Sequence, residues 1–414
     1  MLKRLAFGDS NLPRQFTVGM NDPQSEISVW LHGLSEPYDV TERHVMACVK
    51  PMTIGVVFRP EWKIGSGSVN RLSLRFRERR GNQRLVGEIF LQGRGEVVPA
   101  PGLRLFGVRG SANYCLPILR LRLHQLHLLY TRWRFNNNPE IKVSPREAHA
   151  MIVFFICPRP VVLVSVVHGN EGNVFPMNLM GPIGDGRFAF SLNSTRHAAP
   201  ITGRAGRLAI SSVPFEMAPL ARQLGKNHYK DSIDMTQLPF TATMSPEYGL
   251  PVPEFAVRVR EMEIEFKEKL GSHTFFITRL VHDERYSSTP EFFYVHGIYQ
   301  AWRIRNGIAA LACGTGLRFG TRRPAVSTTT ARRSFQSRSQ CMGSEPIYGC
   351  TDGASGAFSL ACGAPKDDEP EDSRRSSASG STCTRPRSVF HFKTESLAET
   401  DRTRRGEVAD EMRG

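Results

Sequence analysis

Several features that mark known protein classes are missing from this sequence. No apolar run reaches the length needed to span a bilayer, and the basic start MLKRLAFGDSNLPRQF lacks the apolar core of a secretory signal. None of the eight cysteines stands in a CxxC pair, so the common spacing of a zinc site is absent. These absences predict a cytoplasmic protein with reduced thiols, without a metal site or a membrane partner.

A Rossmann domain is also not indicated, because no GxGxxG fingerprint follows a strand. The 414 residues are 40% hydrophobic and 22% charged, as in an ordinary soluble protein with one or two cores. The net charge of +15 is high. It fits binding to nucleic acid, to an anionic membrane surface or to small anions such as phosphates, or simply scattered surface arginines.

The composition divides the chain into four segments. Residues 1–35 are an N-terminal segment, 36–145 a β-rich module of unknown role, and 146–303 a second, mainly β unit. Residues 304–414 are rich in Ser, Thr, Arg and Gly and have few apolar clusters. Such a segment buries too little apolar surface to offset its ordering entropy, which predicts a disordered tail.

A helix start marks the junction between the two β-rich parts. Ser144 reads as an N-cap, Pro145 as the first helical residue and Glu147 as the partner that completes a capping box. Upstream, the length of LPILRLRLHQLHLLYTRW favours a helix over a strand.

Strand patterns dominate residues 146–303. VVLVSVV (161–167) is continuously apolar and β-branched, which is typical of a buried strand. FAVRVREMEIEFKEKL alternates in two sets that are out of phase by one residue, which predicts one long strand with a bulge near Arg260–Glu261. Together with two or three short helices, the pattern predicts a small closed or nearly closed β-barrel.

The candidate site lies in NVFPMNLMGPIGDGRFAFSLNSTR (173–196). Pro176 cannot donate to a ladder, so its strand is an edge strand or leaves the sheet there. Asn193, Ser194, Thr195 and Arg196 follow a second strand. A helical turn starting near Ser194 or Thr195 would combine free backbone N–H groups, hydroxyls and a guanidinium into a phosphate site. An ordinary N-cap with a surface arginine is the alternative, and these residues alone favour it.

The ordered series of motifs across residues 150–303 resembles the flavin reductase-like, FMN-binding split-barrel family. The series comprises the strand and Gly/Asn turn of RPVVLVSVVHGNEGN, the Asn-x-x-Pro strand, LGKNHYKDSID, LGSHTFFITRLV and HGIYQAWR. Ser272 stands where an aspartate is usual in that family. The resemblance implies a Greek-key split barrel, usually a homodimer, with a flavin near the dimer interface. Residues 36–145 would then be an extra β-rich module.

The resemblance also implies site residues. Contacts to the isoalloxazine, mainly through backbone, would come from Asn173, Pro176, Met177, Asn178 and Leu179. The ribityl phosphate would be bracketed by Ser191, Asn193, Ser194, Thr195 and Arg196. His273 would sit near the flavin and nicotinamide face, as a catalytic residue. Taken without the resemblance, His273 is more typical of a turn or packing histidine.

The function that this resemblance implies is an NAD(P)H-dependent flavin reductase, which transfers hydride from NADH or NADPH to FMN, or to FAD in its place. A flavin carrier or sensor without turnover is the alternative from another class. A basic nucleic-acid-binding protein is the third, and it needs aromatics interleaved with basic residues. RLSLRFRERR offers only Phe76 among its arginines, which argues against nucleic acid as a partner.

Overall fold

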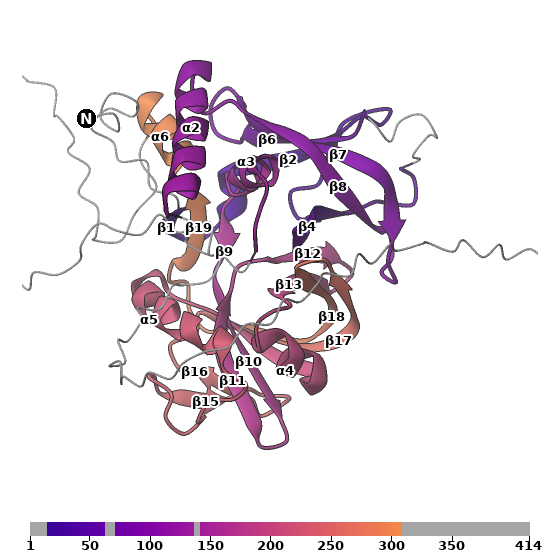
Figure 1. Cartoon of the computed structure of the whole chain (residues 1–414). Coiled ribbons are helices and arrows are strands. Elements are labelled where there is room, and N and C mark those ends of the chain that lie inside the picture. Colours follow the sequence, from indigo (N-terminus) through magenta and orange to yellow (C-terminus); the bar gives the residue numbers. More distant parts are fainter. Residues whose placement is uncertain (1–14, 63–70, 136–140, 309–414) are drawn as a thin grey trace, which may run out of the picture. The chain divides into compact units, whose positions relative to one another are not determined.

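The computed structural model describes residues 15–62, 71–135 and 141–308 (Figure 1). Two seven-stranded antiparallel sheets form the framework of this part of the chain, and the expected mainly β fold class is confirmed. The disorder expected for the tail lies outside the described residues, except that residues 304 and 305 complete a helix.

The first sheet belongs to the N-terminal half, and its strand order is β3-β2-β6-β7-β8-β5-β4. Its strands are β2 (Ile27–His32), β3 (Tyr38–Asp39), β4 (His44–Val49), β5 (Met52–Val57), β6 (Ser73–Glu78), β7 (Leu85–Val97) and β8 (Leu103–Asn113). The sheet therefore begins before residue 36, where the sequence placed the start of the module. The reason is that β2 pairs with β6 along its whole length.

Two helices follow this sheet, as the sequence predicts. They are α2 (Ile118–Phe135) and α3 (Pro145–Phe154). The capping box of α3 is present: the Glu147 N–H donates to Ser144 Oγ at 3.2 Å, and the Ser144 N–H donates to Glu147 Oε2 at 2.8 Å.

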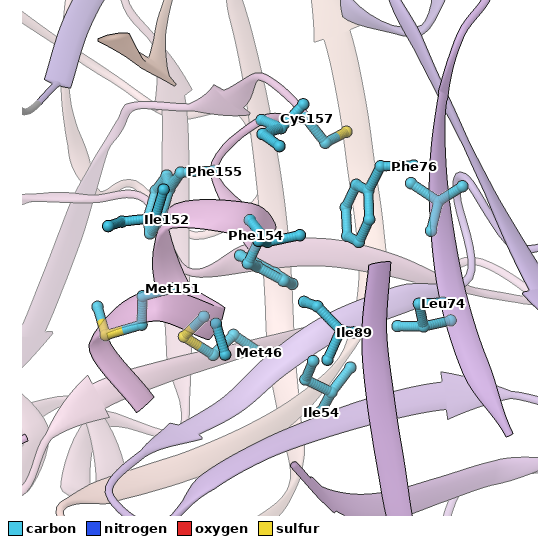
Figure 2. Close-up of a cluster of buried hydrophobic side chains, with 14 of the residues drawn as sticks. Met46, Ile54, Leu74, Phe76, Ile89, Met151, Ile152, Phe154, Phe155 and Cys157 are labelled. Carbon is cyan, nitrogen blue, oxygen red and sulfur yellow. The ribbon is translucent and has the colours of Figure 1, made fainter. Parts of the chain in front are cut away.

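Helix α3 packs into the core of the N-terminal half, although the sequence assigned it to the second unit. Figure 2 shows its Met151, Ile152 and Phe154 in one cluster with Met46 of β4 and Phe76 of β6. The apolar end of the helix explains this placement, because residues 150–154 are all buried and need a core to pack against.

The second sheet contains the candidate site and has the strand order β11-β10-β14-β17-β18-β13-β12. Its strands are β10 (Val162–His168), β11 (Glu171–Met177), β12 (Met180–Gly184), β13 (Arg187–Asn193), β14 (Arg207–Ser212), β17 (Arg258–Leu270) and β18 (His273–Arg285). Strand β11, which contains Pro176, is at the edge, as the proline requires. Strand β17 shifts register between Glu261 and Met262, at the predicted bulge, and again between Ile264 and Phe266.

The remaining elements cover or connect the sheets. Strand β19 (Glu291–His296) pairs on one side with β1 (Gln15–Met20) and on the other with β9 (Arg159–Pro160). Short elements lie between β14 and β17: the 3-10 turns η3 (Phe215–Met217) and η4 (Leu224–Tyr229), helix α5 (Ala218–Gln223), and the paired strands β15 (Ala242–Met244) and β16 (Pro251–Pro253). Helix α4 (Ala198–Ala205) packs on the second sheet beside β10 (Figure 1), and α6 (Gly297–Arg305) follows β19.

The described residues lack two features. Among residues 15–62, 71–135 and 141–308, no helix is long and apolar enough to cross a membrane. In the same ranges, no group of three or more His, Cys, Asp and Glu side chains is arranged to hold a metal ion.

Candidate functional site

The end of β13 lies directly beside the start of β18. Asn193 pairs with His273 in the ladder, and the Ser194 N–H donates to the Ser272 carbonyl at 3.0 Å. The Ser194 and Thr274 hydroxyls are hydrogen-bonded at 3.0 Å. The antiparallel pairing thus brings the residue expected to be catalytic, His273, next to the residues expected to hold a phosphate.

A tight turn then leads from β13 into α4. Asn193 Oδ1 accepts hydrogen bonds from the backbone N–H and the hydroxyl of Thr195, both at 3.0 Å. Such an Asx turn reverses the chain without further secondary structure. Helix α4 therefore begins at Ala198, later than the helical turn expected near Ser194 or Thr195. Its N-cap, His197, makes no side-chain capping bond, so the first turn lacks a side-chain acceptor.

Arg196 is buried behind this turn, with 8% of its surface exposed. Its guanidinium carbon lies 4.7 Å from the centre of the Tyr229 ring, in η4. Beside it, the His197 and Asp231 side chains are bonded, Nδ1 to Oδ1, at 2.5 Å. The segment after α5 therefore closes over the turn, and it supplies an aromatic face to the arginine.

His273 is buried and is neutral at pH 7. Burial, together with the smaller effect of the positive charge of Arg196, lowers its pKa to about 4. Its Nδ1 is hydrogen-bonded to Ser272 Oγ at 2.9 Å. The imidazole can exchange hydrogen bonds, but it does not supply a positive charge at neutral pH.

The residues expected to contact the isoalloxazine do not all lie in one place. Leu179, between β11 and β12, accepts a hydrogen bond from the Ser191 N–H at 3.1 Å, which places it beside β13. The Pro176 carbonyl is bonded to Nε2 of His228 in η4 at 2.7 Å. Asn178 is buried, and Met177 packs in the core of the sheet.

Asn173 has a structural partner instead. Its Nδ2 donates to the carbonyls of Asn227 and Lys230, at 3.0 and 2.9 Å, and so ties η4 to β11. Its side chain is fully buried, and its Oδ1 has no hydrogen-bond partner. Asn173 therefore holds the segment that carries Tyr229.

Ser191 is likewise engaged within the protein. Its hydroxyl is within hydrogen-bond distance of the Ala47 and Met46 carbonyls in β4, at 2.7 and 3.1 Å. Because a hydroxyl has a single proton to donate, these carbonyls leave it none for a ligand.

Sequence reasoning missed three contributors to the site. Tyr229 and His228 stand in LGKNHYKDSID, which was quoted only as part of a family motif. Their aromatic and imidazole side chains, close to Lys226, could have drawn attention to this segment as part of the site. Lys50, whose N–H donates to Ser272 Oγ at 3.0 Å, comes from the other sheet, and no local signal in the sequence points to it.

Residues 154–303 match the model of the flavin reductase like domain. This finding confirms the resemblance predicted for residues 150–303. The match covers the whole second sheet together with β9, β19 and most of α6.

Several solved structures are similar to parts of the chain. The FMN-binding protein from Thermus thermophilus is 25% identical over 31% of this chain and 72% of its own, with a TM-score of 0.28. The NADH:FAD oxidoreductase SgcE6 of Streptomyces globisporus is 18% identical over 38% of this chain and 95% of its own, with a TM-score of 0.34. BorF, the flavin reductase component of a bacterial tryptophan halogenase, is 18% identical over 36% of this chain and 92% of its own, with a TM-score of 0.32. No curated protein matches the chain.

The turn before α4 combines an accessible surface with a buried positive charge. Thr195 and His197 are exposed, so the turn can be reached from solvent, whereas Arg196 is buried just behind it. In the first turn of α4 the Ala199 N–H donates to the Arg196 carbonyl and Pro200 has no N–H, so positive charge at the turn comes from Arg196 more than from the helix end. Among the residues expected to bracket a phosphate, the hydroxyls of Ser191 and Thr195 do not fit as donors, because they donate to a β4 carbonyl and to Asn193 Oδ1.

Proposed function

We propose that the protein is a flavin-dependent oxidoreductase that reduces FMN with NADH or NADPH. The proposal rests on one observation: a polar cluster lies where the end of β13 pairs with the start of β18. There an exposed turn, a buried guanidinium and a neutral imidazole adjoin the connection from β11 to β12. The proposal includes FAD in place of FMN, and it includes either NADH or NADPH as the hydride donor.

In this proposal the phosphate of the flavin is held by the turn before α4. The Ser194 hydroxyl, which can accept from the Thr274 hydroxyl, would donate a hydrogen bond, and Arg196 would supply positive charge from behind. The Tyr229 ring keeps the guanidinium in place, 4.7 Å from its centre. Asn173 supports this arrangement indirectly, by fixing η4 to β11.

The ring system would lie against the connection from β11 to β12. Asn178 and Leu179 would contact it through backbone groups, which requires no reactive side chain. His273 would orient a bound ring through hydrogen bonds, because its low pKa keeps it neutral at pH 7. A bound flavin supplies the redox chemistry itself, and the protein's part is to bind, to orient and to exclude water.

The phosphate assignment predicts that the double variant Ser194→Ala/Arg196→Ala binds FMN about 10-fold more weakly or worse. Charge-assisted hydrogen bonds contribute roughly 1.5–3 kcal/mol each, so losing one is enough for this change. The measurement is a fluorescence titration of FMN. Arg204→Ala is the matched control, because it removes an exposed arginine from α4 that pairs with Glu171.

Two further observations separate a binding defect from a folding defect. Ser194→Ala removes only one half-buried hydroxyl and should weaken FMN binding without lowering the melting temperature. If both variants titrate like the unsubstituted protein, the phosphate does not lie at this turn. If FMN binds but neither NADH nor NADPH is oxidised, the protein is a flavin carrier or sensor and the reductase proposal is wrong.

A further inference from the structure

The two seven-stranded sheets have the same topology. Each has seven strands in chain order: β2 to β8 in the first sheet, and β10 to β14 followed by β17 and β18 in the second. When the strands of each sheet are numbered from one to seven, both sheets have the order 2-1-5-6-7-4-3. All neighbouring pairs in both sheets are antiparallel. A shared order of seven strands with shared directions indicates two copies of one fold.

The registers of the two sheets match at the end where the candidate site lies. In the second sheet the last residue of β13, Asn193, pairs with the first residue of β18, His273. In the first sheet the last residue of β5, Val57, pairs with the first residue of β8, Leu103.

One hydrogen bond next to these pairs is also repeated. The Ser194 N–H donates to the Ser272 carbonyl at 3.0 Å, and the Phe58 N–H donates to the Gly102 carbonyl at 2.8 Å. The register therefore equates Phe58 of the first copy with Ser194 of the second.

Corresponding strands of the two copies pack against each other. One apolar cluster contains residues of β4, β5 and β8 from the first copy and of β12, β13 and β18 from the second. These are the third, fourth and seventh strands of each copy. The cluster comprises Val45, Ala47, Val57, Val98, Ala100, Leu103, Leu105, Ile183, Ala189, Phe275 and Ile277. The contact has the form of an interface between two like subunits, in which the same surface is used twice.

Hydrogen bonds link the first copy to the candidate site of the second. The Ser272 N–H donates to the Lys50 carbonyl at 2.8 Å, and the Lys50 N–H donates to Ser272 Oγ at 3.0 Å. Cys48 Sγ donates to the Leu270 carbonyl at 2.6 Å, and Ser191 Oγ lies within bonding distance of two β4 carbonyls. The turn between β4 and β5 therefore fixes the chain next to His273.

Only the second copy keeps a polar site at this end. Where it has Asn193, Ser194 and His273, the first copy has Val57, Phe58 and Leu103, and all three are buried. The Phe58 ring packs with Trp62 and Phe106 at centroid distances of 6.0 and 5.8 Å. The guanidinium carbons of Arg104 and Arg59 lie 5.8 and 5.9 Å from the centres of the Phe58 and Trp62 rings, so this end of the first copy keeps positive charge but has apolar side chains where the second has amide, hydroxyl and imidazole groups.

We propose that residues 27–113 are a second, non-binding copy of the split barrel that takes the place of a partner subunit within one chain. Each chain then has one ligand site, at the ends of β13 and β18, and the β4–β5 turn of the first copy holds that site in shape. The identity of the ligand as a flavin rests on the proposed function, whereas the pairing of the two copies does not. The homodimer expected from the family resemblance is replaced by this internal pair.

The pairing is tested in the full chain with Ser272→Cys. Cys48 Sγ lies 3.5 Å from Ser272 Oγ, so a cysteine at position 272 is close enough to form a disulfide with small adjustments. After mild oxidation, we expect a peptide cross-linked between Cys48 and position 272 in chains that migrate as monomers without reductant. The control Cys48→Ser/Ser272→Cys should give no such peptide. A cross-link found only in covalent dimers, or no cross-link, would overturn the internal pairing.

Flavin stoichiometry tests the remaining part of the inference. Titration of the full chain with FMN should saturate at one FMN per chain. Two FMN per chain would show that the first copy also binds and would refute the single site while leaving the proposed function intact. If FMN does not bind at all, the proposed function is wrong, and the cross-link still decides whether the two copies pair within one chain.

Discussion

Lowering the pH from 6.5 to about 5 is expected to destabilise the folded protein by roughly 5 kcal/mol. Three buried histidines cause this effect. Burial lowers the pKa values of His44 and His296 to about 3 and that of His273 to about 4, from 6.5 in the unfolded chain. Nearby positive groups act in the same direction: Arg159 on His44, Arg196 on His273, and two further histidines on His296.

The sign follows from proton binding. Between pH 6.5 and about 4 the unfolded chain binds a proton at each of these positions, whereas the folded protein does not. Their stabilising contribution is therefore complete above pH 6.5 and is lost as the pH falls toward the folded pKa values. Each histidine contributes about 1.4 kcal/mol per pH unit in this window.

The hydrogen bonds of two of these histidines require the neutral ring. Because an arginine only donates, His44 Nε2 accepts from Arg159 and its Nδ1 donates to the Val40 carbonyl. His296 is the N-cap of α6, and its Nδ1 accepts a hydrogen bond from the Ile298 N–H at 3.2 Å. Protonation would remove both acceptors.

Urea unfolding at several pH values between about 7.5 and 5 measures the effect. His44→Gln can keep both hydrogen bonds, since the amide donates and accepts, and it should reduce the slope by about 1.4 kcal/mol per pH unit. His168→Gln is the matched control at an exposed position. A free energy of unfolding that stays constant from pH 7 to 5 would contradict the prediction.

Local rules made the regular elements of this fold predictable from the sequence. The Ser144–Glu147 capping box, the edge strand of Pro176 and the bulge in β17 each depend on a few neighbouring residues, and the structure confirms all three. The proximity of Asn193 and His273 was predictable only from the family resemblance, because 80 residues separate them and strand pairing brings them together.

Contacts between the two copies could not be predicted in this way. Ser191 was assigned to the ligand because its place at a strand end suits a phosphate, yet its hydroxyl is bonded to β4, which is more than 140 residues away in the chain. The shared topology is also hidden in the sequence. The segment between the fifth and sixth strands spans residues 213–257 in the second copy and only 79–84 in the first. Composition and periodicity record strands, but they do not record their order.

Arg303→Met is expected to destabilise the protein by about 3–5 kcal/mol, because it leaves a buried carboxylate without its partner. Arg303 of α6 donates to Glu26, and both side chains are only 5% exposed. Arg303 also lies 5.8 Å from the centre of the Tyr299 ring. Glu26 has a second cationic neighbour in Arg80, 3.6 Å away, but that side chain is largely exposed and is screened by water.

The double variant Glu26→Met/Arg303→Met separates the loss of a charge pair from the loss of packing. It should be considerably more stable than Arg303→Met alone, because replacing both members of a buried pair by apolar side chains is often neutral. Arg204→Met is the matched control: its pair with Glu171 is about half exposed, so it should cost no more than about 1 kcal/mol. Chemical denaturation gives all three values. If Arg303→Met is no more destabilising than Arg204→Met, Glu26 is not held as an isolated buried charge, and α6 is not fixed to the N-terminal half by this pair.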